Sequence, residues 1–142
     1  RSRGRIYSHA LGTFGVVIQG TASLIQRFSG PFPQNLQGAP FLFPAEGSTL
    51  RVEVERWFQQ WGIRPMVRGV FEDAELLLAL GRAGEGFFPV PDLGILAAKR
   101  HRVGTLEGVR VPIHALSLER RLTHPAVRVI QAMAERILGP TA

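Results

Sequence analysis

The chain has 142 residues, a mass of 15.6 kDa and 45% hydrophobic residues, which is enough for one globular domain with a real core. It contains no cysteine, which excludes disulfides, thiolate metal sites and cysteine nucleophiles. The net charge of +6, from 17 basic and 11 acidic residues, is carried mostly by scattered arginines, so a nucleic-acid-binding surface is an alternative without a local basic cluster to support it.

No apolar run approaches the roughly 20 residues that a membrane-spanning helix needs, and no signal peptide is recognisable after the basic residues 1–5. We therefore expect a cytoplasmic protein. Because the sequence begins without methionine and inside a charged segment, we also expect that a natural N-terminal part precedes it.

The first third of the chain predicts two strands, a short helix and a loop. Residues 5–11 alternate between apolar and polar types, and the β-branched run within residues 12–20 is typical of a buried strand. Residues 21–28 predict a short helix with Thr21 as its N-cap. Two prolines place residues 29–37 in a loop.

The best-defined element is a helix between two short strands. Residues 39–43 and 66–71 are apolar runs bounded by proline or glycine. Between them, Ser48 or Thr49 can cap a helix that Gly62 ends. Its predicted apolar face consists of Leu50, Val54, Trp57, Phe58 and Trp61, with Arg51 among the polar positions. A strand-helix-strand unit of this size predicts a parallel α/β crossover.

The pattern then repeats. Glu72 and Asp73 open a helix over residues 74–83, which is apolar nearly all round and is therefore expected to be buried between layers. Residues 87–90 predict a strand and residues 91–100 a helix. Strands follow over residues 103–106 and 109–116, and a final helix opens at 123–125, with Val127, Ile130 and Ile137 on its apolar stripe. The fold class is α/β.

The chemistry of the sequence favours binding over catalysis. The four histidines, His9, His101, His114 and His124, are far apart, so no metal site follows from local spacing, and no cofactor is expected. No nucleophile stands beside a base at a recognisable spacing, so we expect no enzyme. Two helix starts that face the ends of parallel strands predict a cleft for a small anion near Ser48 and Thr49. For either hydroxyl alone, ordinary helix capping is the more frequent role.

Three local patterns carry a resemblance to a known family. They are residues 47–51 (Gly-Ser-Thr-Leu-Arg) with 57–58 and 62–65, residues 71–77 (Phe-Glu-Asp-Ala-Glu-Leu-Leu) with 84–87, and residues 119–127 (Glu-Arg-Arg-Leu-Thr-His-Pro-Ala-Val). Their order resembles the C-terminal effector-binding domain of LysR-type transcriptional regulators. The last two are most similar to the subgroup that includes activators of a sodium/proton antiporter gene.

The resemblance implies a fold like that of type II periplasmic binding proteins, with the N-terminal winged helix-turn-helix and the first half of the effector domain missing. Residues 1–19 would be the entering strand and crossover, 20–102 the second α/β subdomain, and 103–142 the return crossover and C-terminal helix of the first subdomain. Effector contacts would come from Ser48, Thr49 and Phe71, and from the crossover at Thr13 and Phe14.

The implied function is effector sensing and oligomerisation in a regulator of transcription. The partners would be further copies of the chain in a dimer or tetramer, a small molecule or ion, and promoter DNA through the missing domain. The alternatives are a stand-alone solute-binding module of similar fold and a basic nucleic-acid-binding protein.

Overall fold

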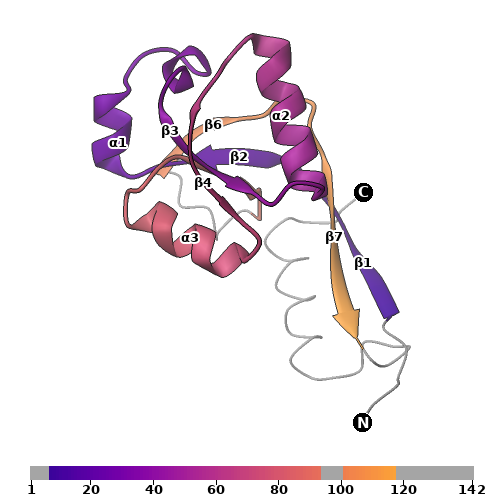
Figure 1. Ribbon diagram of the computed structural model, residues 1–142. Helices are drawn as coiled ribbons and strands as arrows, with labels where there is room; N and C mark the ends of the chain where they lie inside the picture. The colour runs from indigo at the N-terminus through magenta and orange to yellow at the C-terminus, as the bar shows by residue number, and fades with distance from the viewer. Residues whose placement is uncertain (1–6, 94–100, 118–142) are drawn as a thin grey trace.

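Two long paired strands project from the main body of the protein. The computed structural model describes residues 7–93 and 101–117. Strand β1 (Tyr7–Phe14) pairs antiparallel with β7 (Val111–Ser117) along its whole length, and the register shifts between Ala10 and Gly12. Figure 1 shows this ribbon projecting from the body. Both predicted crossover segments are therefore strands, and they lie side by side.

The centre of the body is strand β2 (Val16–Gln19), whose residues Val16, Val17 and Ile18 are fully buried. It pairs antiparallel with β5 (Phe88–Pro91) on one side and with β6 (Arg102–Thr105) on the other. The predicted strands after residue 102 are both present. Strand β6 pairs with β2, and strand β7 pairs with β1. The turn that contains Gly108 connects β6 to β7.

The parallel unit joins this sheet through one bridge. Strands β3 (Pro40–Pro44) and β4 (Met66–Phe71) are parallel, as predicted. Phe41 forms a parallel bridge with Phe87, and the Leu42 N–H donates to the Phe87 carbonyl over 2.8 Å. The strands of the body thus follow one another in the order β4, β3, β5, β2 and β6.

The helices begin at the residues that the sequence predicts. Thr21 caps α1 (Ala22–Arg27), Ser48 caps α2 (Thr49–Trp61) and Asp73 caps α3 (Ala74–Arg82), each by accepting a hydrogen bond from a backbone N–H of the first turn. Gly62 ends α2 in the left-handed conformation, with φ of 66°. The predicted loop contains a short 3-10 helix, η1 (Gln34–Leu36).

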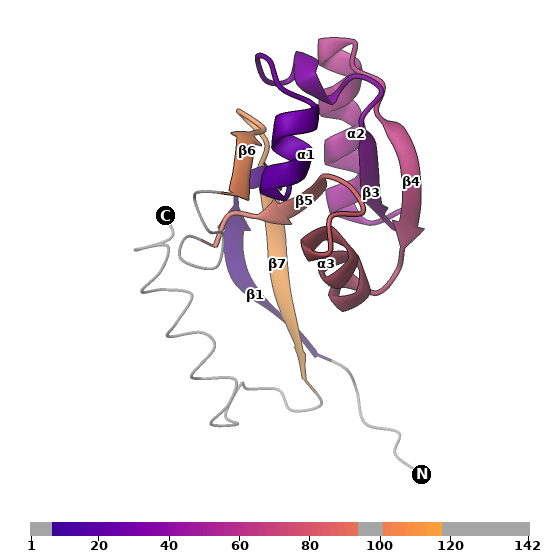
Figure 2. The same ribbon diagram turned by 90° about the vertical axis from the view of Figure 1, so that its left-hand side faces the viewer.

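The pleat of β3 divides the core between two sides. Phe41 and Phe43 belong to the larger apolar cluster, which includes side chains of α1 and α2. Leu42, which points the other way, packs with Leu77 of α3 and Phe88 of β5. In Figure 2, β5 passes between α1 and α3. The strands therefore separate α3 from the other helices.

Three expectations about helix faces are wrong. Trp61 is 51% exposed because it lies in the last turn of α2, with its ring 5.8 Å from that of Trp57. Arg51, expected among the polar positions, is 7% exposed. Helix α3 is not buried all round: Leu77 and Gly81 are buried, whereas Leu76 is 48% exposed, because only one face meets β3, β4 and β5.

Some expectations lie outside the described residues. They are the arginines of residues 1–5, residues 94–100 of the helix expected over 91–100, and the final helix with Val127, Ile130 and Ile137. The expected start of the helix over 91–100 is wrong, because Pro91 is the last residue of β5 and pairs with Val16. The division at residues 19 and 102 stays a prediction.

Candidate functional site

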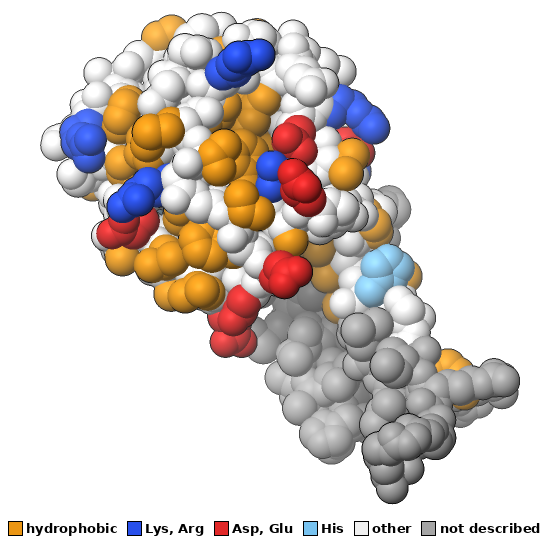
Figure 3. All heavy atoms as spheres, viewed as in Figure 1, with side chains coloured by type: hydrophobic (Ala, Val, Ile, Leu, Met, Phe, Trp, Pro, Cys, Tyr) orange, Lys and Arg blue, Asp and Glu red, His pale blue; other side chains and the backbone are white. Residues whose placement is uncertain are grey.

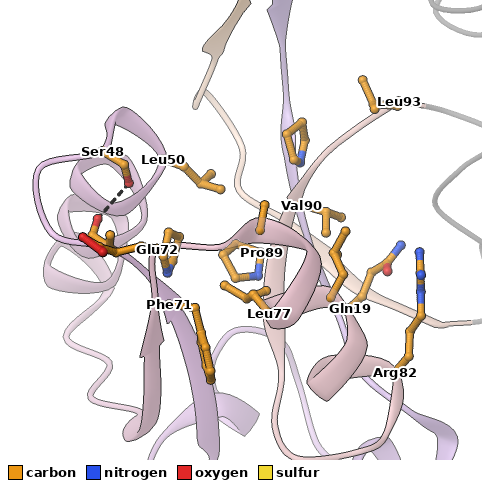
Figure 4. Close-up of a pocket in the computed structure, with 15 residues that line it drawn as sticks. Gln19, Ser48, Leu50, Phe71, Glu72, Leu77, Arg82, Pro89, Val90 and Leu93 are labelled. Atoms are coloured by element: carbon orange, nitrogen blue, oxygen red, sulfur yellow. Dashed lines mark hydrogen bonds between the residues drawn. The ribbon is translucent and has the colours of Figure 1, made fainter. Parts of the chain in front are cut away.

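A cavity of about 430 Å³ opens between the N-terminus of α2, the helix α3 and the strand β5. Figure 4 shows its lining, which comes from the ends of β2, β3 and β4 as well as from these elements. Most of the lining side chains are apolar, among them Leu50, Leu77 and Val90. Ser48, Glu72, Gln19 and Arg82 supply polar groups. A concave, mostly apolar site with a few polar groups is the usual form of a small-molecule pocket.

Ser48 forms one edge of the cavity, and its hydroxyl is already engaged. It donates to the Ala45 carbonyl over 2.9 Å, the bond drawn in Figure 4, and accepts from the Arg51 N–H over 3.1 Å. A hydroxyl has a single proton to donate. In this conformation Ser48 therefore cannot also donate to a bound anion through its side chain.

Arg51 holds the loop that carries Ser48. Its Nη1 donates to the Pro44 carbonyl over 2.9 Å, and its guanidinium lies 4.6 Å from the centre of the Phe43 ring. Its Nε lies 3.0 Å from Oε1 of Glu55, but the N–H does not point at that oxygen well enough for a hydrogen bond, so we count this contact as an ion pair only. The buried guanidinium thus fixes the end of β3 relative to α2.

Phe71 lies where β4 ends and also lines the cavity. It is half-buried and packs against the cluster of Leu42, Leu77 and Phe88. The next residue, Glu72, is exposed at the cavity wall, and in Figure 4 it lies at the Ser48 end. This end of the cavity therefore carries a negative charge.

Gln19 and Arg82 lie at the opposite end in Figure 4. Gln19 is the last residue of β2, and Arg82 is the last residue of α3. Both also line a second cavity of about 180 Å³, together with Thr21 and His101, so they stand between the two spaces. Sequence reasoning missed both residues. The sequence indicated only that each of them ends a predicted element. It did not place Gln19 at this cavity, because β2 runs antiparallel to β5.

The other predicted site residues do not line this cavity. Thr49, the first residue of α2, is exposed. Phe14 is buried, and Thr13 is exposed at the end of β1. Nη2 of Arg110 donates to the Thr13 carbonyl over 2.7 Å and to its hydroxyl over 3.4 Å. The structure therefore brings Ser48 and Phe71 together and leaves the crossover pair apart from them.

The described residues offer neither a cluster of metal ligands nor a membrane-spanning helix. Within residues 7–93 and 101–117, no three His, Cys, Asp or Glu side chains come together in a way that could hold a metal ion. In the same part of the chain, no helix has the length and apolar character needed to cross a membrane.

The sequence matches a known family over nearly its whole length. Residues 6–138 match the family model described as the LysR substrate binding domain. The transcriptional activator protein NhaR of Escherichia coli (strain K12) is 34% identical over 104 residues, which cover 70% of this chain and 35% of NhaR. The chain thus corresponds to about a third of the length of this relative.

Solved structures show the same fold. The effector binding domain of QuiR in complex with shikimate superposes with a TM-score of 0.57 at 18% identity, covering 92% of this chain and 64% of that one. CbnR, a LysR family transcriptional regulator, superposes with a TM-score of 0.55 at 27% identity, covering 97% of this chain and 48% of CbnR. The LysR effector domains have a fold like that of periplasmic binding proteins, and theirs is a family of transcription regulators rather than of enzymes. The chain therefore belongs to the LysR substrate-binding domain family.

Proposed function

We propose that the 430 Å³ cavity between α2, α3 and β5 is the effector site of this domain. The observation that carries the proposal is the meeting of two predicted site residues, Ser48 and Phe71, at one apolar cavity with a few polar groups. Its volume is at the lower end of the range for ligand pockets, about 300–1,000 Å³, which favours a small molecule. The function is recognition and not catalysis.

Effector binding would act on transcription through the crossover strands. Strands β1 and β7 lead out of the body side by side, and Arg110 ties the start of β7 to Thr13. A ligand that binds better to one arrangement of the body and the ribbon would shift the population toward it. A separate DNA-binding part, acting in the cytoplasm on a promoter, would respond to that shift. Thr13, Phe14 and Thr49 would take part in this change of arrangement and would not contact the ligand in the cavity.

Self-association as a dimer or tetramer is part of the same proposal. Among the strands described, β4 pairs with β3 alone, so its other edge is unpaired. Met66, Val67 and Val70 on this strand are each at least 50% exposed. Figure 3 shows hydrophobic side chains gathered over this region. An exposed apolar edge strand favours pairing with another chain.

The arginines give little support to a nucleic-acid-binding surface. Arg51, Arg56, Arg68 and Arg102 each form an ion pair with a carboxylate. On the face drawn in Figure 3 the basic side chains lie apart from one another. A stand-alone solute-binding module would use the same cavity. The ligand of such a module would not change the affinity for promoter DNA of a protein that contains this chain. The effector of a regulator would change that affinity.

A cavity-filling substitution tests the proposed site. Ala74 is exposed in the first turn of α3 and lines the cavity, whereas Ala79 is exposed on the same helix and does not line it. We expect Ala74→Trp to abolish the binding of small cyclic acids such as shikimate, measured by calorimetry and by NMR shift changes of the cavity residues. Ala79→Trp is the matched control and should bind as the unmodified chain does. Equal binding by the two variants would refute the location of the site.

A further inference from the structure

We infer that the effector is an organic anion with an apolar body, and that Arg82 and Gln19 hold its charged group. This inference rests on the proposed function, because it concerns the same cavity. It differs from the expectation that the helix start at Ser48 and Thr49 binds the anion, and it favours an organic anion over a metal cation as the ligand of this cavity.

The first step is the charge distribution along the cavity. Glu72 is the acidic residue of its lining, and it lies at the Ser48 end. Arg82 is the basic residue of its lining, and it lies at the other end. An anionic group is repelled by the first and attracted by the second. The cavity is therefore polarised, and an anion binds best at the Arg82 end.

The second step is the availability of hydrogen-bond donors. The Ser48 hydroxyl gives its proton to Ala45. In contrast, the guanidinium of Arg82 has no hydrogen bond, ion pair or ring contact within the described part of the chain, and the same holds for the side-chain amide of Gln19. A guanidinium offers two parallel N–H groups that match a carboxylate, and the amide of Gln19 adds another donor.

The third step is the alternative role of Arg82. A cation in the last turn of a helix is favourable because of the helix dipole, and this could be its whole purpose. The helix dipole alone does not explain why Arg82 lines a cavity next to the side-chain amide of Gln19, which has no partner among the described residues. Arg64 is likewise without a side-chain partner among the described residues, but it does not line the cavity.

The fourth step is the middle of the cavity. Leu77, Val90 and Pro89 form its wall between the two polar ends. An apolar ring or branched body fills such a space, and a hydroxyl on its far side can donate to Glu72. For Ca²⁺ or Mg²⁺ the lining offers one carboxylate, that of Glu72, whereas protein sites for these ions usually combine several oxygen ligands.

The test compares a charged probe with its neutral isostere. We expect the chain to bind benzoate more tightly than benzamide, and Arg82→Gln to weaken benzoate binding roughly tenfold to hundredfold, the size of one charge-assisted interaction. Benzamide binding should change little in this variant. The matched control Arg64→Gln removes an equally unpartnered exposed arginine and should leave both affinities unchanged. Binding is measured by NMR titration of the cavity residues.

Different failures separate this inference from the proposed function. If both probes bind, Ala74→Trp abolishes both, and Arg82→Gln changes neither, the site stands and the role of Arg82 is refuted. If no probe perturbs the cavity residues in a way that depends on Ala74, both proposals fall. Sodium ions are the second arm of the experiment. Shift changes at Glu72 and Ser48 that sodium induces and Glu72→Gln abolishes would overturn the assignment of an organic anion.

Discussion

Replacing Arg51 by alanine should destabilise the protein more than any other single arginine substitution in α2. The hydrogen bond from Nη1 to the Pro44 carbonyl is buried, and such a bond to a charged donor contributes about 1.5–3 kcal/mol. The contact with the Phe43 ring adds about 0.5–1 kcal/mol. The ion pair with Glu55 is discounted to about 0–1 kcal/mol, because Glu55 is half exposed. We expect a total loss of about 2–5 kcal/mol in the free energy of unfolding.

The assay is urea unfolding followed by tryptophan fluorescence, to which Trp57, buried in α2, and Trp61, exposed in its last turn, both contribute. The midpoint should fall while the slope stays unchanged, as expected for a change in stability alone. Arg56→Ala is the matched control on the same helix. Its ion pair with Glu53 spans 3.4 Å at the surface, so its loss should cost less than about 0.5 kcal/mol. Equal midpoints for Arg51→Ala and Arg56→Ala would refute the reasoning.

Arg51→Lys separates the shape of the guanidinium from its charge. Lysine keeps the positive charge but cannot reach the Pro44 carbonyl and lie flat over Phe43 at once. We expect an intermediate loss of about 1–2 kcal/mol. A lysine variant as stable as the unmodified chain would mean that charge alone matters at this position.

Three other predictions concern stability and assembly. Gly20→Ala should cost about 1–3 kcal/mol in thermal unfolding, because the added methyl would lie 2.5 Å from the ring of a fully buried phenylalanine, whereas Gly15→Ala meets only one atom at 4.0 Å and should be nearly neutral. Ser48→Ala should lower stability by about 1–2 kcal/mol through the lost helix cap, while Thr49→Ala should change it by less than about 0.5 kcal/mol; equal effects in urea unfolding would contradict the cap assignment. Val67→Glu should lower the mass measured by light scattering if the exposed edge of β4 joins two chains, and an unchanged oligomer would exclude that edge.

Local signals made most of the fold predictable. The caps at Ser48 and Asp73 and the left-handed stop at Gly62 act within one turn of their own helix, so the sequence around them is sufficient to predict them. The strands were recognisable for the same reason, because β-branched runs and proline boundaries are local. The pairing of the strands was harder to predict. Strands β6 and β7 were predicted, but their partners β2 and β1 lie far away in the sequence.

Burial on the helices was harder to predict because it depends on the path of neighbouring loops. Arg51 has a typical surface residue type, yet it is buried because the loop after β3 turns back over α2 and presents the Pro44 carbonyl to it. Leu76 has a typical core residue type, yet it is exposed because only one side of α3 meets the strands. Neither the burial of Arg51 nor the exposure of Leu76 can be predicted from the residues next to them along the helix.

About half of the candidate site could be predicted from the sequence, and the reason is similar. Ser48 and Phe71 were found because parallel strands end at one edge, and β3 and β4 are parallel. Gln19 was missed because β2 runs antiparallel to its neighbour β5, which changes the end of the sheet at which its last residue lies. Arg82 was missed because a basic residue at the end of a helix is so often explained by the helix dipole.

The two ends of the cavity therefore differ in what a substitution there can reveal. At the Ser48 end, the polar groups stabilise the fold: Arg51 engages Pro44, and Ser48 engages Ala45. At the other end, Arg82 and Gln19 are unengaged among the described residues. Loss of effector binding in a Ser48 variant would thus be confounded with loss of the helix cap. A change at Arg82 leaves the described hydrogen bonds intact, so a change in binding there reports recognition itself.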